Sequence, residues 1–221
     1  MKKGITRSAL SIVFLVLFFG ALIGQSFAGH AVTVAENLQH GEPAPGYWEY
    51  LWSSEFVVDV AENWQSEFLQ FFVFIAATVW FVQQSSPESK APRDEGTQSD
   101  RQQKVGRFAD NDSPQWARSR GFRQWVYANS LLLVMGTLFM LSWLAQSVAG
   151  HIVMNSDRMQ HGQSTLSWAQ YLASPDFWDR TLQNWQSEFL AVGVMIAFAI
   201  YLRQRGSSES KPVGAPHYAQ Q

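Results

Sequence analysis

Two glutamates with identical neighbours are the residues of this chain best suited to chemistry. Glu67 and Glu188 each occupy the fifth position of the heptapeptide Asn-Trp-Gln-Ser-Glu-Phe-Leu, and Glu188 follows Glu67 by 121 residues. Both stand at the start of an apolar run. A carboxylate in such a run is costly, so it must find hydrogen-bond donors, become protonated or face a polar interior. Two of them in one helical bundle could hold a cation or relay a proton.

Amide and imidazole side chains are expected at the same depth as the glutamates. A rise of about 1.5 Å per residue along each helix puts Gln25 level with Glu67, and His30 level with Asn63. The second copy repeats the arrangement. The candidate polar layer therefore comprises Gln25, His30, Asn63, Glu67, Gln146, His151, Asn184 and Glu188. These groups either hydrogen-bond the glutamates and keep the helices in register, or line a pathway for ions or protons.

Other kinds of site lack their motifs in this sequence. The chain has no cysteine, which excludes disulfides and thiolate chemistry. Histidines at 30, 40, 151 and 161 could serve a metal with a glutamate, but ten residues along one helix separate two side chains by about 15 Å. No phosphate loop, GxSxG or HExxH motif is present. We therefore predict no metal site, no cofactor and no enzymatic activity.

The elements that must position these residues come from a tandem repeat. Besides the heptapeptide, Gln39–Gly41 returns as Gln160–Gly162, and Tyr50-Leu51 returns as Tyr171-Leu172, always 121 residues later. Each copy carries two apolar runs, near 9–28 and 68–82 in the first and near 131–149 and 189–202 in the second. A helix needs about 20 residues to cross a bilayer. We predict an all-α integral membrane protein with four transmembrane helices, built from a duplicated hairpin in parallel orientation.

The distribution of charge predicts orientation and organisation. Lys and Arg gather before the first run, between the second and third, and after the fourth, whereas residues 31–62 contain none. Because cytoplasmic loops collect positive charge, both termini and the central linker should lie on the cytoplasmic side. The predicted parts are a hairpin at 1–84, a polar linker at 85–122, a second hairpin at 123–206 and a tail at 207–221. A net charge near −2 offers no surface for nucleic acid.

The first apolar run has a second interpretation as a secretory signal. Lys2, Lys3 and Arg7 precede it and Ser26-Phe27-Ala28 ends it, as in a cleavable leader. The third run, however, ends in a similar Gln-Ser-x-Ala-Gly-His sequence deep inside the chain. Since the shared ending suits a position that cannot be cleaved, we expect the first helix to be retained.

Local signals predict where several helices begin and end. Gly41 is suited to stop the first helix, and 47–52 should form a short amphipathic turn. Ser174-Pro175-Asp176 has the hydroxyl, proline and acid of a helix start, and Ser53 is its counterpart. Helices that follow these serines should run for about 28 residues. Gly20, Gly24 and Ala28 form a small-residue stripe of the kind that lets helices approach closely. Residues 116–125 are basic and aromatic, as on surfaces that meet anionic headgroups.

Three sequence elements resemble a family of uncharacterised bacterial membrane proteins, classed as a domain of unknown function. These elements are Gln-His-Gly at 39–41 and 160–162, the heptapeptide at 63–69 and 184–190, and Gln204–Pro212 in the tail. The resemblance implies a bacterial inner-membrane location and brings no activity or cofactor. The expected partners are the lipid bilayer and a membrane or envelope protein. We expect a non-enzymatic protein that binds or organises such a component, with an ion or proton pathway through Glu67 and Glu188 as the alternative.

Overall fold

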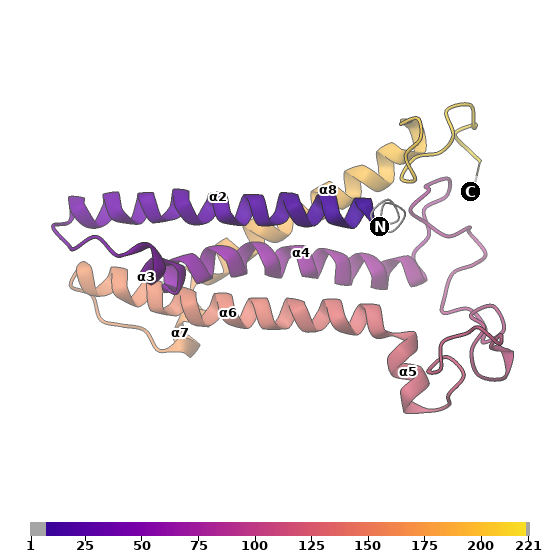
Figure 1. Ribbon diagram of the computed structural model, residues 1–221, viewed down its shortest axis with the longest axis horizontal. Helices are drawn as coiled ribbons and strands as arrows, with labels where there is room; N and C mark the ends of the chain where they lie inside the picture. The colour runs from indigo at the N-terminus through magenta and orange to yellow at the C-terminus, as the bar shows by residue number, and fades with distance from the viewer. Residues whose placement is uncertain (1–7, 220–221) are drawn as a thin grey trace. The chain divides into compact units, whose positions relative to one another are not determined.

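The computed structural model describes residues 8–219, which form helices and irregular connections and contain no strand. The predictions that involve Lys2, Lys3 and Arg7 concern positions outside the described residues. Figure 1 shows long helices joined by short ones and by one extended linker. The helices are α2 (Ala9–Gln39), α3 (Tyr47–Leu51), α4 (Ser54–Trp80), α5 (Phe122–Ala128), α6 (Ser130–Gln160), α7 (Trp168–Leu172) and α8 (Pro175–Tyr201), with a 3₁₀ turn at Gly106–Phe108. The prediction of an all-α fold is confirmed.

The helices recur at the spacing of the sequence elements. α2 and α6 each have 31 residues, α3 and α7 have 5, and α4 and α8 have 27. Each member of the second set begins 121 residues after its counterpart in the first. The predicted length of about 28 residues for α4 and α8 is therefore close to the observed length.

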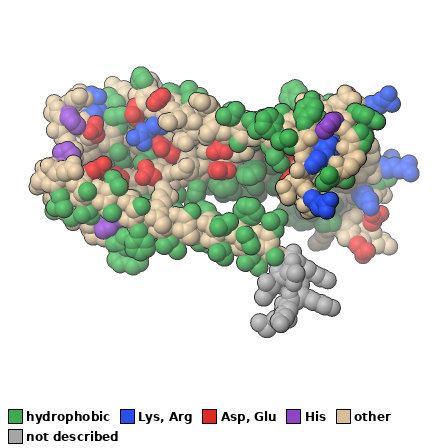
Figure 2. All heavy atoms as spheres, turned by 90° about the horizontal axis from the view of Figure 1, so that it is seen from above, with side chains coloured by type: hydrophobic (Ala, Val, Ile, Leu, Met, Phe, Trp, Pro, Cys, Tyr) green, Lys and Arg blue, Asp and Glu red, His purple; other side chains and the backbone are tan. Residues whose placement is uncertain are grey.

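Two of the described helices, α2 and α6, are long and apolar enough to cross a membrane. α4 and α8 are long enough as well, since 27 residues at about 1.5 Å each span roughly 40 Å. Their first halves carry acids, however, including Glu55, Asp59 and Glu62 in α4. Figure 2 shows hydrophobic side chains among polar and charged ones on the visible surface.

The helix ends follow the predicted signals. The Ser174 hydroxyl accepts a hydrogen bond from the Phe177 amide at 3.3 Å, with Pro175 in the first turn and Asp176 at the positive end of the helix. The Ser53 hydroxyl does the same for Phe56, also at 3.3 Å. Gly41 follows the end of α2 with a φ of +73°, a conformation that glycine adopts at little cost. These caps satisfy amides that would otherwise lack partners.

The chain divides into two compact units: Met1–Val60 with Val148–Leu166, and Ala61–Ser147 with Ser167–Gln221. In the first unit, α3 packs against α2 through aromatic contacts. The Tyr47 and Ser26 hydroxyls lie 2.8 Å apart, and the Tyr47 ring stacks on Phe27 at 4.9 Å. Tyr50 is only 2% exposed and its hydroxyl sits on the backbone at Gly29. A small residue at position 29 therefore allows α3 to reach α2.

A methyl group at Gly29 should destabilise the first unit. An added Cβ would lie 2.0 Å from the Tyr50 hydroxyl oxygen, and the buried tyrosine has little room to move. We expect Gly29→Ala to lower the free energy of unfolding by about 1–3 kcal/mol, the usual cost of overpacking. Gly24→Ala on the same helix is the control, because its Cβ would meet no atom within 4 Å and should be neutral or stabilise by up to about 1 kcal/mol. Thermal unfolding in detergent measures both, and equal effects would contradict the prediction.

Candidate functional site: a polar interface of α4, α6 and α8

Buried polar side chains connect α4 to α8 in the second unit. Gln65 is 0% exposed, and its side-chain oxygen accepts a hydrogen bond from the Trp185 indole nitrogen at 2.8 Å. The neighbouring Ser66, also buried, donates to Glu188 Oε1 at 3.4 Å and to the carbonyl of Asn63 at 3.0 Å. These bonds stabilise one register of α4 on α8, because a slip along either helix would leave buried polar groups without partners.

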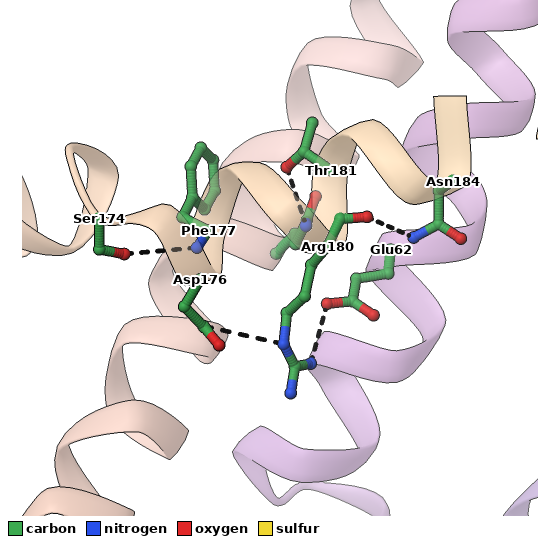
Figure 3. A network of polar contacts seen from close by, with 8 residues as sticks. Glu62, Ser174, Asp176, Phe177, Arg180, Thr181 and Asn184 are labelled. Carbon is green, nitrogen blue, oxygen red and sulfur yellow. Dashed lines mark hydrogen bonds and ion pairs between the residues drawn. The ribbon is translucent and has the colours of Figure 1, made fainter. Parts of the chain in front are cut away.

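An ion pair extends the same contact toward the start of α8. The Arg180 guanidinium donates to Glu62 at 3.0 Å and approaches Asp176, one turn earlier, at 3.8 Å (Figure 3). The Glu62 side chain is 15% exposed and that of Arg180 is 42% exposed, so solvent screens the pair only in part. Asn184 donates to the Arg180 carbonyl at 3.0 Å. The ion pair adds specificity at an edge of the interface that water can reach.

α6 joins this interface through Gln146 and an aromatic cluster. The Gln146 amide nitrogen, fully buried, lies 3.4 Å from the Thr181 hydroxyl of α8. One turn earlier, the Trp143 ring meets Phe177, Trp178 and Trp185, with ring centroids 5.9–6.3 Å apart. Aromatic pairs at these distances contribute packing beyond their buried area. Trp185 of α8 therefore contacts both Gln65 of α4 and Trp143 of α6, and Thr181 adds a second contact with α6.

Three buried polar atoms at this interface have no hydrogen-bond partner within residues 8–219. They are the amide nitrogen of Gln65, the side-chain oxygen of Gln146 and the indole nitrogen of Trp143. Two donors and one acceptor thus remain available on α4 and α6, beside side chains that are already bonded. Groups of this kind could bind a small neutral hydrogen-bonding molecule such as water. None of these three atoms carries a charge.

The two identical heptapeptides have different surroundings. In α4 the heptapeptide buries Gln65 and Ser66 and leaves Glu67 exposed, without a hydrogen bond or ion pair in the described chain. In α8 the equivalents Gln186 and Ser187 are exposed, whereas Trp185 and Glu188 face α4. Of the predicted polar layer, Asn63 accepts from Ser66 through its backbone carbonyl, and the Asn184 side chain donates to the Arg180 carbonyl, each within its own helix. Sequence reasoning missed Gln65, Ser66 and Thr181, although Gln65 and Ser66 lie next to the glutamate it selected.

The predicted histidines hydrogen-bond the connections that follow their helices. The His30 Nε2 lies 2.9 Å from the Pro45 carbonyl oxygen, and the His151 Nε2 lies 2.7 Å from that of Leu166. Each ring thus bonds the carbonyl fifteen residues later. Gln25 is half-buried and makes no hydrogen bond in the part of the chain described. Within residues 8–219 no group of three His, Asp or Glu side chains is placed to hold a metal ion.

A second polar feature follows the ends of α4 and α8. The sequence Gln-x-Ser/Gly-Ser-x-Glu-Ser-Lys occurs at 83–90 and again at 204–211. In the first turn the Ser89 hydroxyl accepts a hydrogen bond from the backbone amide of Gln83 at 2.7 Å. In the second turn the Ser210 hydroxyl accepts one from the backbone amide of Gln204 at 2.8 Å. Both third residues, Ser85 and Gly206, have positive φ. The spacing of 121 residues could have revealed this pair of turns from sequence alone.

The two turns meet through their glutamates. The Glu88 and Glu209 carboxyls hydrogen-bond one another, and both line a cavity of about 210 Å³ whose other walls are mostly apolar residues of α4 and α8. Burial, with the hydrogen bond and charge of Glu209, raises the pKa of Glu88 to about 6 from its ordinary 4.5. Hydrogen bonds from Ser208 and Glu88 lower the pKa of Glu209. Glu88 is thus the proton donor of the pair and Glu209 the acceptor.

The chain belongs to the family described as domain of unknown function (DUF6766), whose model matches residues 1–221. This agrees with the resemblance to an uncharacterised family. No curated protein and no solved structure matches the chain.

Removal of the Gln65 side chain should weaken the α4–α8 contact. Gln65→Ala removes a fully buried side chain and leaves the indole nitrogen of half-buried Trp185 without its acceptor, so we expect a loss of about 1–3 kcal/mol in the free energy of unfolding. Gln186→Ala changes the same residue of the same heptapeptide at an exposed position and should cost under about 0.5 kcal/mol. Chemical or thermal unfolding compares the two, and a similar loss in both would show that the interface does not depend on Gln65.

The carboxyl pair should make stability depend on pH. Because the folded pKa of Glu88 is about 6 and the ordinary value is 4.5, its contribution is fully present below pH 4.5 and is lost as the pH rises through 6. Glu88→Gln stays neutral, so it should match wild type near pH 5 and be more stable at pH 7.5. We expect a gain of under about 1 kcal/mol, since solvent screens the partly exposed group.

The control for this prediction is Glu95→Gln, which changes an exposed glutamate of the linker. Melting temperatures of wild type and both variants at the two pH values provide the measurement. A Glu88→Gln variant that is less stable than wild type at pH 7.5, or a Glu95→Gln variant with the same pH response, would contradict the assignment.

Proposed function

We propose that this member of the DUF6766 family is a non-enzymatic integral membrane protein of the bacterial inner membrane that binds or organises another membrane protein. It would cross the bilayer four times as two copies of one hairpin, with both termini and the linker in the cytoplasm. The positive charge of the linker supports this orientation. The equal lengths and fixed spacing of the two helix sets support the duplication.

The surface of α2 is the observation that carries the proposal. Leu10, Phe14 and Leu17 are each more than 50% exposed, and further exposed apolar residues follow along the helix. An added Cβ at Gly20 or Gly24 would meet no atom within 4 Å, so nothing in the described part of the chain packs on these two glycines of the stripe. In a membrane such a stripe allows a second helix to approach closely enough for backbone packing. An apolar helix with this stripe is suited to lipid on one face and a partner helix on the other.

The polar interface supports a structural role for the buried side chains. Gln65 and Trp185 bond each other, Ser66 bonds Glu188, and Arg180 is paired with Glu62. A set of mutually bonded groups stabilises one arrangement of helices without leaving a reactive group free. A protein whose buried polar groups serve packing in this way would present a stable surface to a partner.

An ion or proton pathway is the second candidate. One observation in its favour is that Glu188 is half-buried and accepts a hydrogen bond from Ser66. Another is that the amide nitrogen of Gln65 and the side-chain oxygen of Gln146 have no partner in the described chain. Glu67 is exposed and Glu188 is half-buried, and the two carboxyls lie close enough to interact electrostatically. Because their exposure differs, we expect the two glutamates to behave differently in a transport assay.

Photo-crosslinking in native membranes tests the first candidate. A photoreactive residue at Val16 lies on the stripe side of α2, four residues before Gly20, whereas one at Leu15, nine residues before Gly24, lies on the opposite side of the helix. We expect Val16 to yield a protein adduct, lost in Gly20→Leu/Gly24→Leu, and Leu15 to yield lipid adducts only. The double variant should fold normally, because nothing packs on either glycine.

Lipid adducts alone from both positions would overturn the proposed partner. The purified protein in liposomes should show no ion or proton flux above empty vesicles. Flux that disappears in Glu188→Gln and persists in Glu67→Gln would instead favour the second candidate, since the two variants change the same residue in the same heptapeptide.

A further inference from the structure

We propose that α5 and the arginines beside it form a docking surface for the anionic headgroups of the membrane. The inference rests on the proposed membrane insertion and adds a specific lipid contact to it. The surface is defined by Phe122, Trp125, Arg120 and Arg123, which lie on or immediately before α5, where the chain enters α6. Figure 1 shows α5 turned away from the line of α6 at the end where α6 begins.

The change of direction between α5 and α6 is built by local hydrogen bonds. The Asn129 side chain donates to the Trp125 carbonyl at 2.8 Å, and the Ser130 hydroxyl donates to that of Tyr127 at 2.8 Å. These side chains satisfy the last carbonyls of α5, so the helix ends without continuing directly into α6. If α6 crosses the bilayer, its first residues lie at a membrane surface, and a helix that turns aside there can lie along that surface.

The aromatic side chains of α5 face outward. Phe122 is 75% exposed and Trp125 is 52% exposed, and their rings stack with centroids 6.1 Å apart. In water two large exposed rings on a seven-residue helix would lose the benefit of burial. At a bilayer surface they would occupy the boundary between headgroups and acyl chains, where tryptophan in particular is favoured.

The charged residues nearest α5 along the sequence are positive, and the acid Asp100 of the linker lines the same cavity as Trp125. No Asp or Glu occurs from Ser113 to Ser156. Arg120 and Arg123 are exposed and make no hydrogen bond or ion pair in the described chain, whereas Arg118 donates to the carbonyls of Ser113 and Asn111. A guanidinium binds phosphate oxygens in a bidentate way, and anionic lipids attract such groups to the cytoplasmic surface. Exposed rings with free arginines on one short helix fit an anionic lipid surface better than a neutral one.

A single fluorophore tests this docking, since the chain contains no cysteine. The full-length protein carries a label at Ala128→Cys, on α5 but outside the proposed contacts. The labelled protein is reconstituted into vesicles of phosphatidylcholine, either alone or mixed with phosphatidylglycerol. Both kinds of vesicle also contain a lipid that carries a quencher on its headgroup. We expect stronger quenching with phosphatidylglycerol.

Arg120→Gln/Arg123→Gln should weaken docking by on the order of 30-fold, about fivefold for each cation. Arg93→Gln/Arg101→Gln removes the same charge elsewhere in the linker and should change little.

A second label separates this inference from the proposed function. Leu17→Cys on α2 reports insertion through lipids with a quencher in the acyl chain. Loss of that signal would show that α2 is not inserted, which would overturn the proposed function itself. If the label at Leu17→Cys shows that α2 is inserted, two results would overturn the docking surface alone. One is equal quenching of the label at Ala128→Cys in both lipid mixtures, and the other is an equal effect of the two pairs of arginine substitutions.

Discussion

The α4–α8 contact depends on buried polar side chains that hydrogen-bond partners on the facing helix. Gln65 and Ser66 face inward on α4, and Trp185 and Glu188 supply their partners on α8. A polar group removed from water without a hydrogen bond costs more than a bond gains, so these pairs exclude other registers more strongly than apolar packing would. Gln146 and Thr181 extend the same constraint to α6. The aromatic cluster around Trp143 fills the space between these bonds.

This constraint explains why two identical heptapeptides bury different residues. α4 directs its glutamine and serine toward α8, whereas α8 directs its tryptophan and glutamate toward α4. A symmetric contact would have brought the same residues together from both helices. The observed contact is heterologous, and it leaves Glu67 exposed while Glu188 accepts a hydrogen bond. The two glutamates therefore have different surroundings in this interface, although their carboxyls lie close enough to interact electrostatically.

The ends of α4 and α8 show a different relationship. There the repeated turns at 83–90 and 204–211 make the same internal hydrogen bonds, and equivalent glutamates, Glu88 and Glu209, face each other. The contact between Glu88 and Glu209 lies beside a mostly apolar cavity, and the raised pKa of Glu88 makes this contact sensitive to pH. Stability near neutral pH is thus sensitive to a single proton at this end of the second unit, whereas the uncharged Gln65–Trp185 bond should not respond to pH.

Local features of this protein were open to prediction from the sequence. The helical class, the lengths of α4 and α8, the cap at Ser174 and the glycine stop at Gly41 depend on neighbouring residues alone. The faces that α4 and α8 turn toward each other depend on the whole of both helices. Identical heptapeptides carry no information about which side is buried, so only the tertiary structure selected Gln65 over Glu67. The Glu88–Glu209 contact likewise needed the fold, because residues 121 apart meet only after both helices have packed.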